Sequence, residues 1–185
     1  NSPVKSHQSN GVVERGVQAV EGFVRSLRSA LEDRIGVKLT VDDAIWPWLV
    51  EYTSYLLNIM EVGHDGKTAY ERNKGKKAKV LGVEFGEGVL WKRRPVGGAL
   101  GKLAITWEDG IFLGVKGTTN EVIIGAGKGV YRTRTVQRKP VDERWDADLI
   151  KKISGVPWRK SEDDPEADGE AMQSRPLSEE ERKII

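Results

Sequence analysis

The chain has 185 residues, of which 38% are hydrophobic and 31% are charged, and this length allows one ordinary domain or two small ones. Because cysteine is absent, disulfide bonds and thiolate metal sites are excluded. There is no signal-peptide pattern and no apolar run near the roughly 18 residues of a membrane span, so we expect an intracellular protein that is neither secreted nor membrane-bound.

The formal net charge of +2 hides an asymmetry between the body of the chain and its end. Residues 161–185 hold nine acids and three bases, a net charge of −6, so the preceding 160 residues carry +8. A basic body with an acidic tail suits a protein that binds polyanions, although an ordinary solvated surface would also account for it. Beyond Trp158 the sequence is polar, acidic and poor in large apolar residues, so we expect it to be disordered.

The first predicted element is an amphipathic helix that stops at Gly36, with Ser9 or Asn10 as its candidate N-cap. Its apolar residues recur at helical spacings, as do the polar residues of a neighbouring stripe. The apolar residues are Val13, Val17, Val20, Val24, Leu27 and Leu31, and the polar ones are Glu14, Gln18, Glu21, Arg25 and Arg28. We expect the apolar stripe to be uncovered, since its natural partner would lie upstream of this chain.

A second helix is predicted from Thr40, where Asp43 completes a capping-box arrangement, to about Glu61. Pro47 lies too deep to be a first-turn proline, so we expect a late start or a kink there. Residues 63–66 (Gly-His-Asp-Gly) then end the helix, and residues 63–77 are assigned to a linker.

From Ala78 onward, short β-branched and aromatic runs alternate with glycine-rich turns, which is typical of a small antiparallel barrel. Hairpin turns are expected at Asn120-Glu121 and within residues 125–129, where a hairpin is favoured over a phosphate-binding loop because no helix follows. The predicted strands are residues 80–85, 89–92, 103–106, 110–115, 121–124 and 129–135.

Glu14 stands out because it opens the first helix directly behind a polar, turn-forming loop, Gln8-Ser9-Asn10-Gly11. Hard cations such as Mg²⁺ prefer carboxylate oxygens, and an acid in the first turn of a helix is rigidly held and favoured by the helix dipole. The simpler interpretation is an acid that stabilises its own helix. His7 and His64 are both interpreted as loop histidines, so no zinc site is expected.

The run from Gln8 to Glu14 resembles the third acidic motif of retroviral and copia-type retrotransposon integrases. Residues 66–72 (Gly-Lys-Thr-Ala-Tyr-Glu-Arg) resemble a copia pattern downstream of the catalytic core, with Ala69 where that pattern usually has proline. Residues 110–114 (Gly-Ile-Phe-Leu-Gly) and 133–136 (Thr-Arg-Thr-Val) resemble a later copia pattern. The similarity covers roughly residues 2–146.

The resemblance implies that Glu14 is the catalytic third acid of an Asp-Asp-Glu triad and a ligand for Mg²⁺ or Mn²⁺. It also implies that Lys5 and Asn10 lie on the adjacent active-site loop, and that Gln18 and Arg25 face the DNA. Gln8, Ser9 and Asn10 are short polar residues whose side chains can hydrogen-bond phosphates or base edges, so they are further candidates for DNA contact. The parent enzyme would process DNA 3′ ends and join them to a target, in the nucleus, as a homo-oligomer.

No segment before Glu14 supplies the first strands or the two aspartates of such a core, and the first residue is Asn rather than Met. We therefore expect a fragment of a Pol polyprotein that needs the missing N-terminal half as its partner. Alone, it should be inactive and hold no metal ion stably. The expected fold class is α+β: a truncated ribonuclease-H-like core remnant of two helices (1–62), a linker (63–77), a small DNA-binding β-barrel (78–146), and a linker with an acidic tail (147–185).

Basic residues on the predicted barrel are further candidates for DNA contact. Arg93 and Arg94 follow a strand that contains Trp91, and Arg132 and Arg134 are two residues apart, which in a strand places them on one face. Such a face tracks phosphates without reading sequence, whereas the structural alternative is a solvated sheet face. Two other hypotheses stay open for the whole chain: a non-catalytic nucleic-acid-binding module, and a decayed transposon remnant.

Overall fold

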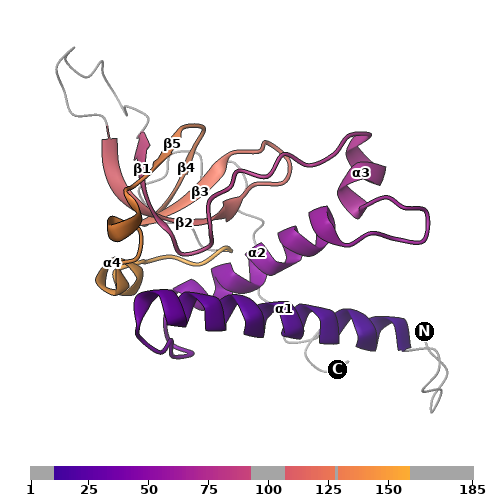
Figure 1. The fold of residues 1–185 in the computed structure, drawn as a ribbon, viewed down its shortest axis with the longest axis horizontal. Helices are drawn as coiled ribbons and strands as arrows, with labels where there is room; N and C mark the ends of the chain where they lie inside the picture. The colour runs from indigo at the N-terminus through magenta and orange to yellow at the C-terminus, as the bar shows by residue number, and fades with distance from the viewer. Residues whose placement is uncertain (1–10, 93–106, 128, 159–185) are drawn as a thin grey trace, which may run out of the picture.

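The computed structural model describes residues 11–92, 107–127 and 129–158. These residues form an α+β fold of helices packed on one antiparallel sheet, as the sequence predicts in outline (Figure 1). In chain order the elements are α1 (Gly11–Ile35), α2 (Ile45–Met60), α3 (Ala69–Lys74), β1 (Gly88–Lys92), β2 (Trp107–Val115), β3 (Val122–Ala126), β4 (Gly129–Thr133), β5 (Val136–Arg138), a 3-10 turn η2 (Val141–Glu143) and α4 (Ala147–Lys151).

α1 is the predicted amphipathic helix, and it ends as predicted at Gly36, which adopts φ 68° and donates its N–H to the Glu32 carbonyl. The apolar stripe of α1 divides into two parts. Val24, Leu27 and Leu31 pack in the core beside α2. Nearer the N-terminus, Val13 is 67% exposed and Val17 53% exposed, so the expectation of an uncovered stripe is confirmed for this half only.

The second helix starts late, which is one of the two outcomes expected from Pro47. Thr40 and Asp43 do bond each other, with the Thr40 N–H and hydroxyl both donating to the Asp43 carboxylate at 2.6 and 3.0 Å. They close a turn ahead of α2, however, and the helix itself begins at Ile45. Pro47 then falls in the first turn, where its missing N–H would have had no helical partner.

α3 lies inside the segment that the sequence assigned to a linker. Thr68 is its N-cap and accepts from the Glu71 N–H, while the Glu71 carboxylate accepts from the Thr68 N–H. This is a complete capping box, and Gly75 in the left-handed region ends the helix. The Thr-x-x-Glu spacing was visible in the sequence and would have indicated this short helix.

The five strands form one antiparallel sheet in the order β4-β3-β2-β1-β5. The two predicted hairpin turns are confirmed: Asn120 takes φ 58° between β2 and β3, and Ala126 pairs with Gly129 between β3 and β4. Only residues 134 and 135 join β4 to β5, although these two strands are the opposite edges of the sheet. The sheet is therefore strongly curled.

The prediction of a closed barrel is wrong, because the edge strands β4 and β5 do not pair with each other in the described part of the chain. Residues 80–85 form no strand either. Positive φ angles at Gly82 and Gly86 interrupt the extended backbone there, and Val80 and Leu81 are exposed. The predicted strand at 103–106 and the predicted disorder of the acidic tail lie outside the described residues.

One hydrophobic core joins the helices to the sheet, with α2 lying between α1 and the sheet (Figure 1). Trp48 and Leu49 of α2 are buried against Ile111 and Leu113 of β2 in this core. The core also includes Ile150 and Ile153, so part of the segment assigned to a linker and tail is folded onto the body. The second cluster, on the other face of the sheet, includes Val89, Trp91, Phe112, Val122 and Ile124.

The glycine at position 110 is required by packing in this second cluster. A side chain there would collide with the Ile124 side chain and would come within 2.9 Å of the Trp91 ring. Gly114, four residues on, has φ 147° at the irregularity in β2–β3 pairing and leaves room for the Tyr52 ring.

Among the described residues, no helix is both long and apolar enough to cross a membrane.

Glu32 fastens the turn between α1 and α2. Its carboxylate accepts from the Lys38 ammonium at 2.8 Å, from Arg28 at 2.7 Å and from the Leu39 N–H at 2.9 Å. These hydrogen bonds, that from Lys38 first, lower the pKa of Glu32 from 4.5 to about 2. Because the folded pKa is depressed, the stabilisation is complete above pH 4.5 and is lost as the pH falls toward 2.

We therefore predict that Glu32→Gln makes the protein less stable at neutral pH and flattens its loss of stability in acid. The measurement is the denaturant midpoint at several pH values across that window. Glu61→Gln, at an exposed position, is the matched control and should keep the wild-type pH profile. An unchanged acid slope in Glu32→Gln would contradict the role given to this carboxylate.

Candidate nucleic-acid interface

The structure places the described residues of the predicted polar stripe on one exposed face of α1. Glu14, Gln18, Glu21 and Arg25 are all exposed, and Glu14 lies in the first turn. The distance along the helix from Glu14 to Arg25 is about 16 Å at the usual rise per residue. Lys5, Gln8, Ser9 and Asn10 precede α1 and lie outside the described residues, so their predicted place beside Glu14 stays a prediction.

Arg28 does not belong to this surface, although its spacing put it on the same stripe. Its guanidinium donates to Glu32 at 2.7 Å and to the Leu39 carbonyl at 3.0 Å, and it lies over the Trp46 ring at 5.0 Å. These contacts use the side chain to hold the α1–α2 turn. With respect to the described residues, Arg25 is therefore the basic residue of the stripe that has no ion pair.

Glu14 by itself does not fit a metal centre. A divalent cation in a protein needs several oxygen ligands, and one acid is rarely enough. In the part of the chain that the structure describes, no three acids or histidines come together in a way that would hold a metal ion. Glu14 thus offers a single carboxylate, and we derive no catalytic step through Mg²⁺ or Mn²⁺ from these residues.

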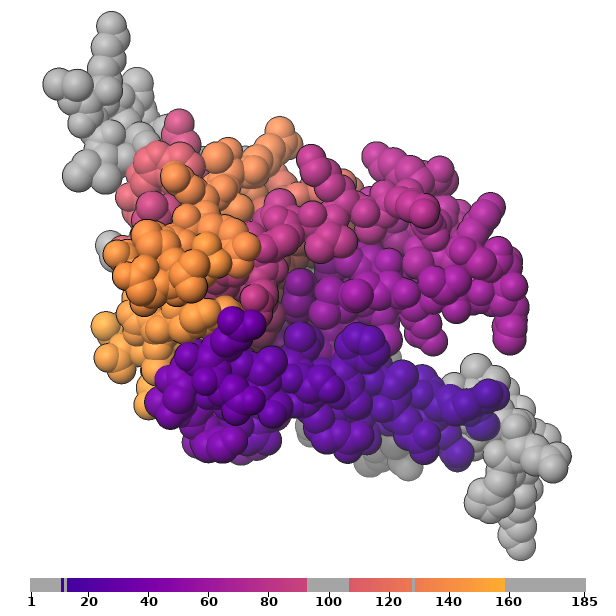
Figure 2. Space-filling model, viewed as in Figure 1, coloured from indigo at the N-terminus to yellow at the C-terminus, as the bar shows by residue number. Residues whose placement is uncertain are grey.

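The N-terminal half of α1 extends away from the other described elements (Figure 1). Figure 2 shows it separated from the α2–α3 region on the face in view. The exposed Val13 and Val17 lie on this half, close to Glu14 in the helix. The half of α1 that carries the acid is also the half on which two valines of the apolar stripe are exposed.

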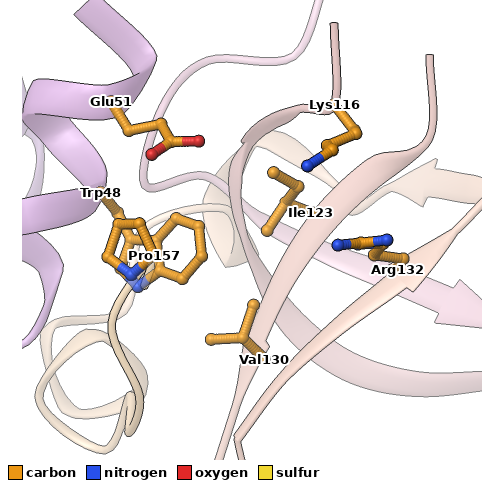
Figure 3. A pocket seen from close by; sticks show the side chains of 7 residues that line it. All are labelled: Trp48, Glu51, Lys116, Ile123, Val130, Arg132 and Pro157. Atoms are coloured by element: carbon orange, nitrogen blue, oxygen red, sulfur yellow. The ribbon is translucent and has the colours of Figure 1, made fainter. Parts of the chain in front are cut away.

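The arginines predicted to share a face of the sheet have different environments. Arg132 is half-buried and lines a small pocket with Lys116, across from Glu51 of α2 (Figure 3). Arg134 lies beyond the end of β4, so the strand alternation does not apply to it, and it pairs with Glu121 at 3.5 Å. Arg132 and Arg134 thus have different immediate partners, while their predicted shared face stays a prediction and Arg93 and Arg94 lie outside the described residues.

Arg138, which belongs to the same basic series, has a structural role. It donates two hydrogen bonds, at 2.6 and 2.8 Å, to the carboxylate of Glu87, whose relative exposure is 0%. This pairing raises the pKa of Arg138. Arg144 also approaches the same carboxylate, at 3.5 Å. Arg138 is thus committed to a buried ion pair and is not available to a polyanion.

Sequence reasoning missed a second group of free cations near the pocket of Arg132. Lys76, Lys77 and Lys79 lie together where the assigned linker (63–77) meets the predicted barrel (78–146), and Lys116 follows β2. None of the four is ion-paired with a described residue. The Lys-Lys-Ala-Lys run was a visible signal, but its position beside the sheet follows only from the fold.

Comparison with protein-family models, with curated proteins and with solved structures gave no match. The likeness to copia-type integrases therefore rests on the sequence motifs alone.

The two arginines near the end of the sheet give a matched test of this division of roles. Arg138→Ala should lower the free energy of unfolding by about 3 kcal/mol, because it leaves the Glu87 carboxylate buried with the Glu84 N–H and the more distant Arg144 as its partners. Arg134→Ala removes the same charge from a position that is 78% exposed, and should cost about 0–1 kcal/mol. Denaturant unfolding of the two variants checks this. Equal losses would contradict the assignment.

Proposed function

We propose that this chain is the C-terminal part of a copia-type integrase, in which α1 presents Glu14 and contacts DNA. In this proposal Glu14 supplies the third carboxylate of the metal-binding set, and two aspartates come from another segment or chain. Gln18 and Arg25 contact the phosphate backbone along α1. The complete enzyme would join DNA 3′ ends to a target, which would place its action in the nucleus.

The observation that carries the proposal is the projecting half of α1. An acid that only stabilised its own helix would not need a neighbouring apolar face left open, yet Val13 and Val17 are exposed beside Glu14. Exposed valines on a rigid helix favour a further protein element that packs there. Such an element would bring other side chains close to Glu14, as a shared catalytic centre requires.

A non-catalytic nucleic-acid-binding module is the second candidate. It is favoured by the absence of a three-ligand acid cluster among the described residues, together with the unpaired basic side chains of Arg25 and Arg132. The two candidates share DNA binding and differ in what Glu14 does. Binding and joining therefore have to be measured separately.

For binding, the 185-residue chain should hold labelled duplex DNA with an affinity that falls steeply with salt. Arg25→Ala should weaken binding and reduce the salt slope by about one, as expected for one lost phosphate contact. Glu14→Gln should leave the affinity almost unchanged, because this acid binds metal rather than DNA. Fluorescence anisotropy across a salt series is the measurement.

Lys151→Ala is the matched control for this binding experiment. It removes one positive charge from α4, which lies far from the projecting end of α1 (Figure 1). It should bind DNA like the wild type. If Arg25→Ala and Lys151→Ala are indistinguishable, α1 is not the contact surface, and if the wild type shows no salt-dependent binding the DNA-binding proposal fails for both candidates.

For joining, the chain alone should give no strand transfer with Mg²⁺. Among the described residues, no set of three acids or histidines forms around Glu14 to hold the metal ion. A gel assay with labelled DNA ends measures this. Adding the two-aspartate segment that the proposal requires should restore joining, and Glu14→Gln should abolish it again. Restored joining that survives Glu14→Gln would remove Glu14 from the catalytic set.

A further inference from the structure

A groove runs between α2 and the connection from β2 to β3, and it consists of three adjoining hollows. The middle one, of about 290 Å³, lies between Tyr52 and Tyr55 of α2 and the end of β2. The second, of about 320 Å³, shares Val115 with the middle one and extends to Tyr70 after α2. The third and smallest shares Glu51 and Ile123 with the middle one.

The groove is strongly basic. Its lining includes one carboxylate, that of Glu51, and five cations, none of which is ion-paired with a described residue. The cations lie at both ends of the groove: Lys76, Lys77 and Lys79 at one end, and Lys116 and Arg132 at the other. Figure 3 shows Lys116, which follows β2, and Arg132 of β4 directed toward the small hollow. An unbalanced set of cations along a groove favours a ligand with repeated negative charges.

Tyrosines line the same groove: Tyr52 and Tyr55 line the middle hollow, and Tyr70 lines the hollow of the three lysines. Tyr52 is held rigidly, because its ring stacks on Phe85 at 5.4 Å and meets Phe112 edge-on at 5.7 Å. Tyr55 stacks on Tyr52 at 6.0 Å and is only half-buried, as is Tyr70. Both Tyr55 and Tyr70 therefore stay partly accessible in the groove, and Tyr55 rests on the supported ring of Tyr52.

We propose that this groove binds single-stranded nucleic acid, with phosphates held by the lysines and Arg132 and bases stacked on Tyr55 and Tyr70. Single-strand sites combine a basic track with aromatic side chains on which unpaired bases stack. A duplex hides the faces of its bases, so it would use the cations but not the tyrosines. An acidic peptide would use the cations in the same way.

The groove and the stripe of α1 are different surfaces, and the groove is argued without Glu14, Gln18 or Arg25. Single-strand binding in the groove thus goes beyond the proposed function. Arg25→Ala reports on duplex binding by α1, while variants in the groove report on single-strand binding. Either proposal can fail alone.

The test is binding of a labelled oligothymidylate of about 12 nucleotides, a length within the usual range of single-strand sites. Tyr55→Ala should weaken binding about tenfold or more, the loss expected for one stacked base. Tyr55→Phe keeps the ring and should restore wild-type affinity, which separates stacking from a folding defect. The double variant Lys77→Ala/Lys79→Ala should also weaken binding and lower its salt slope by about 1.4, which is roughly 0.7 for each lost phosphate contact on a single strand.

Lys151→Ala/Lys152→Ala is the matched control for the double variant. It removes two exposed lysines at and just after the end of α4 and should bind the oligonucleotide normally. Two other ligands complete the experiment: duplex of the same length, and a peptide of residues 161–185, whose net charge is −6. Duplex binding should be insensitive to Tyr55→Ala, and the peptide should not displace the oligonucleotide.

Three results would overturn the proposal. The first is single-strand affinity that does not change in Tyr55→Ala, which would leave only charge. The second is equal loss of duplex and single-strand binding in both groove variants, which would indicate a surface that tracks phosphates. The third is tight binding of the peptide with displacement of the oligonucleotide, which would assign the groove to an acidic segment of protein.

Discussion

The buried carboxylate of Glu87 is the constraint on which the curled sheet depends. It accepts hydrogen bonds from Arg138 of β5 and from the backbone N–H of Glu84, and it forms a longer ion pair with Arg144 at 3.5 Å. The backbone carbonyl of Glu87 also accepts a hydrogen bond from the Phe112 N–H of β2. A charge with no exposure is tolerated only when it is paired and hydrogen-bonded, so these partners must all be in place together. Once they are, the chain after β5 is positioned for Ile150 and Ile153 to enter the core under α2.

This arrangement produces two surfaces with different mechanical character. The groove lies over the shared core, where Tyr52 is supported by Phe85 and Phe112 and cannot easily move. The N-terminal half of α1 has no such support among the described residues, and its stiffness comes from the helix alone. A supported groove suits recognition of a flexible strand, whereas a projecting helix with exposed valines suits assembly with another protein element. Both inferences follow from the extent of the hydrophobic core, which supports the groove but does not reach the N-terminal half of α1.

Patterns that depend on neighbours in the chain were predicted well. Helical spacing found α1, Pro47 indicated the late start of α2, and the glycine and asparagine turns indicated both hairpins of the sheet. Two predictions were wrong, the first for a local reason and the second for a non-local one. Residues 80–85 have the composition of a strand, but positive φ angles at Gly82 and Gly86 prevent it. The barrel was predicted from strand spacing, which is the same for an open curled sheet and for a closed one.

For the candidate site, the sequence by itself determined which residues carry charge and which side chains share a face of α1, because both follow from residue type and the helical repeat. Only the tertiary structure decided which of those charges are free. Arg25, Arg28 and Arg138 carry the same side chain. In the fold, however, Arg25 is exposed, Arg28 pairs with Glu32 and Arg138 pairs with Glu87. The lysines after α3 meet Lys116 and Arg132 along one groove for the same reason: contacts between distant segments exist only once the core has formed.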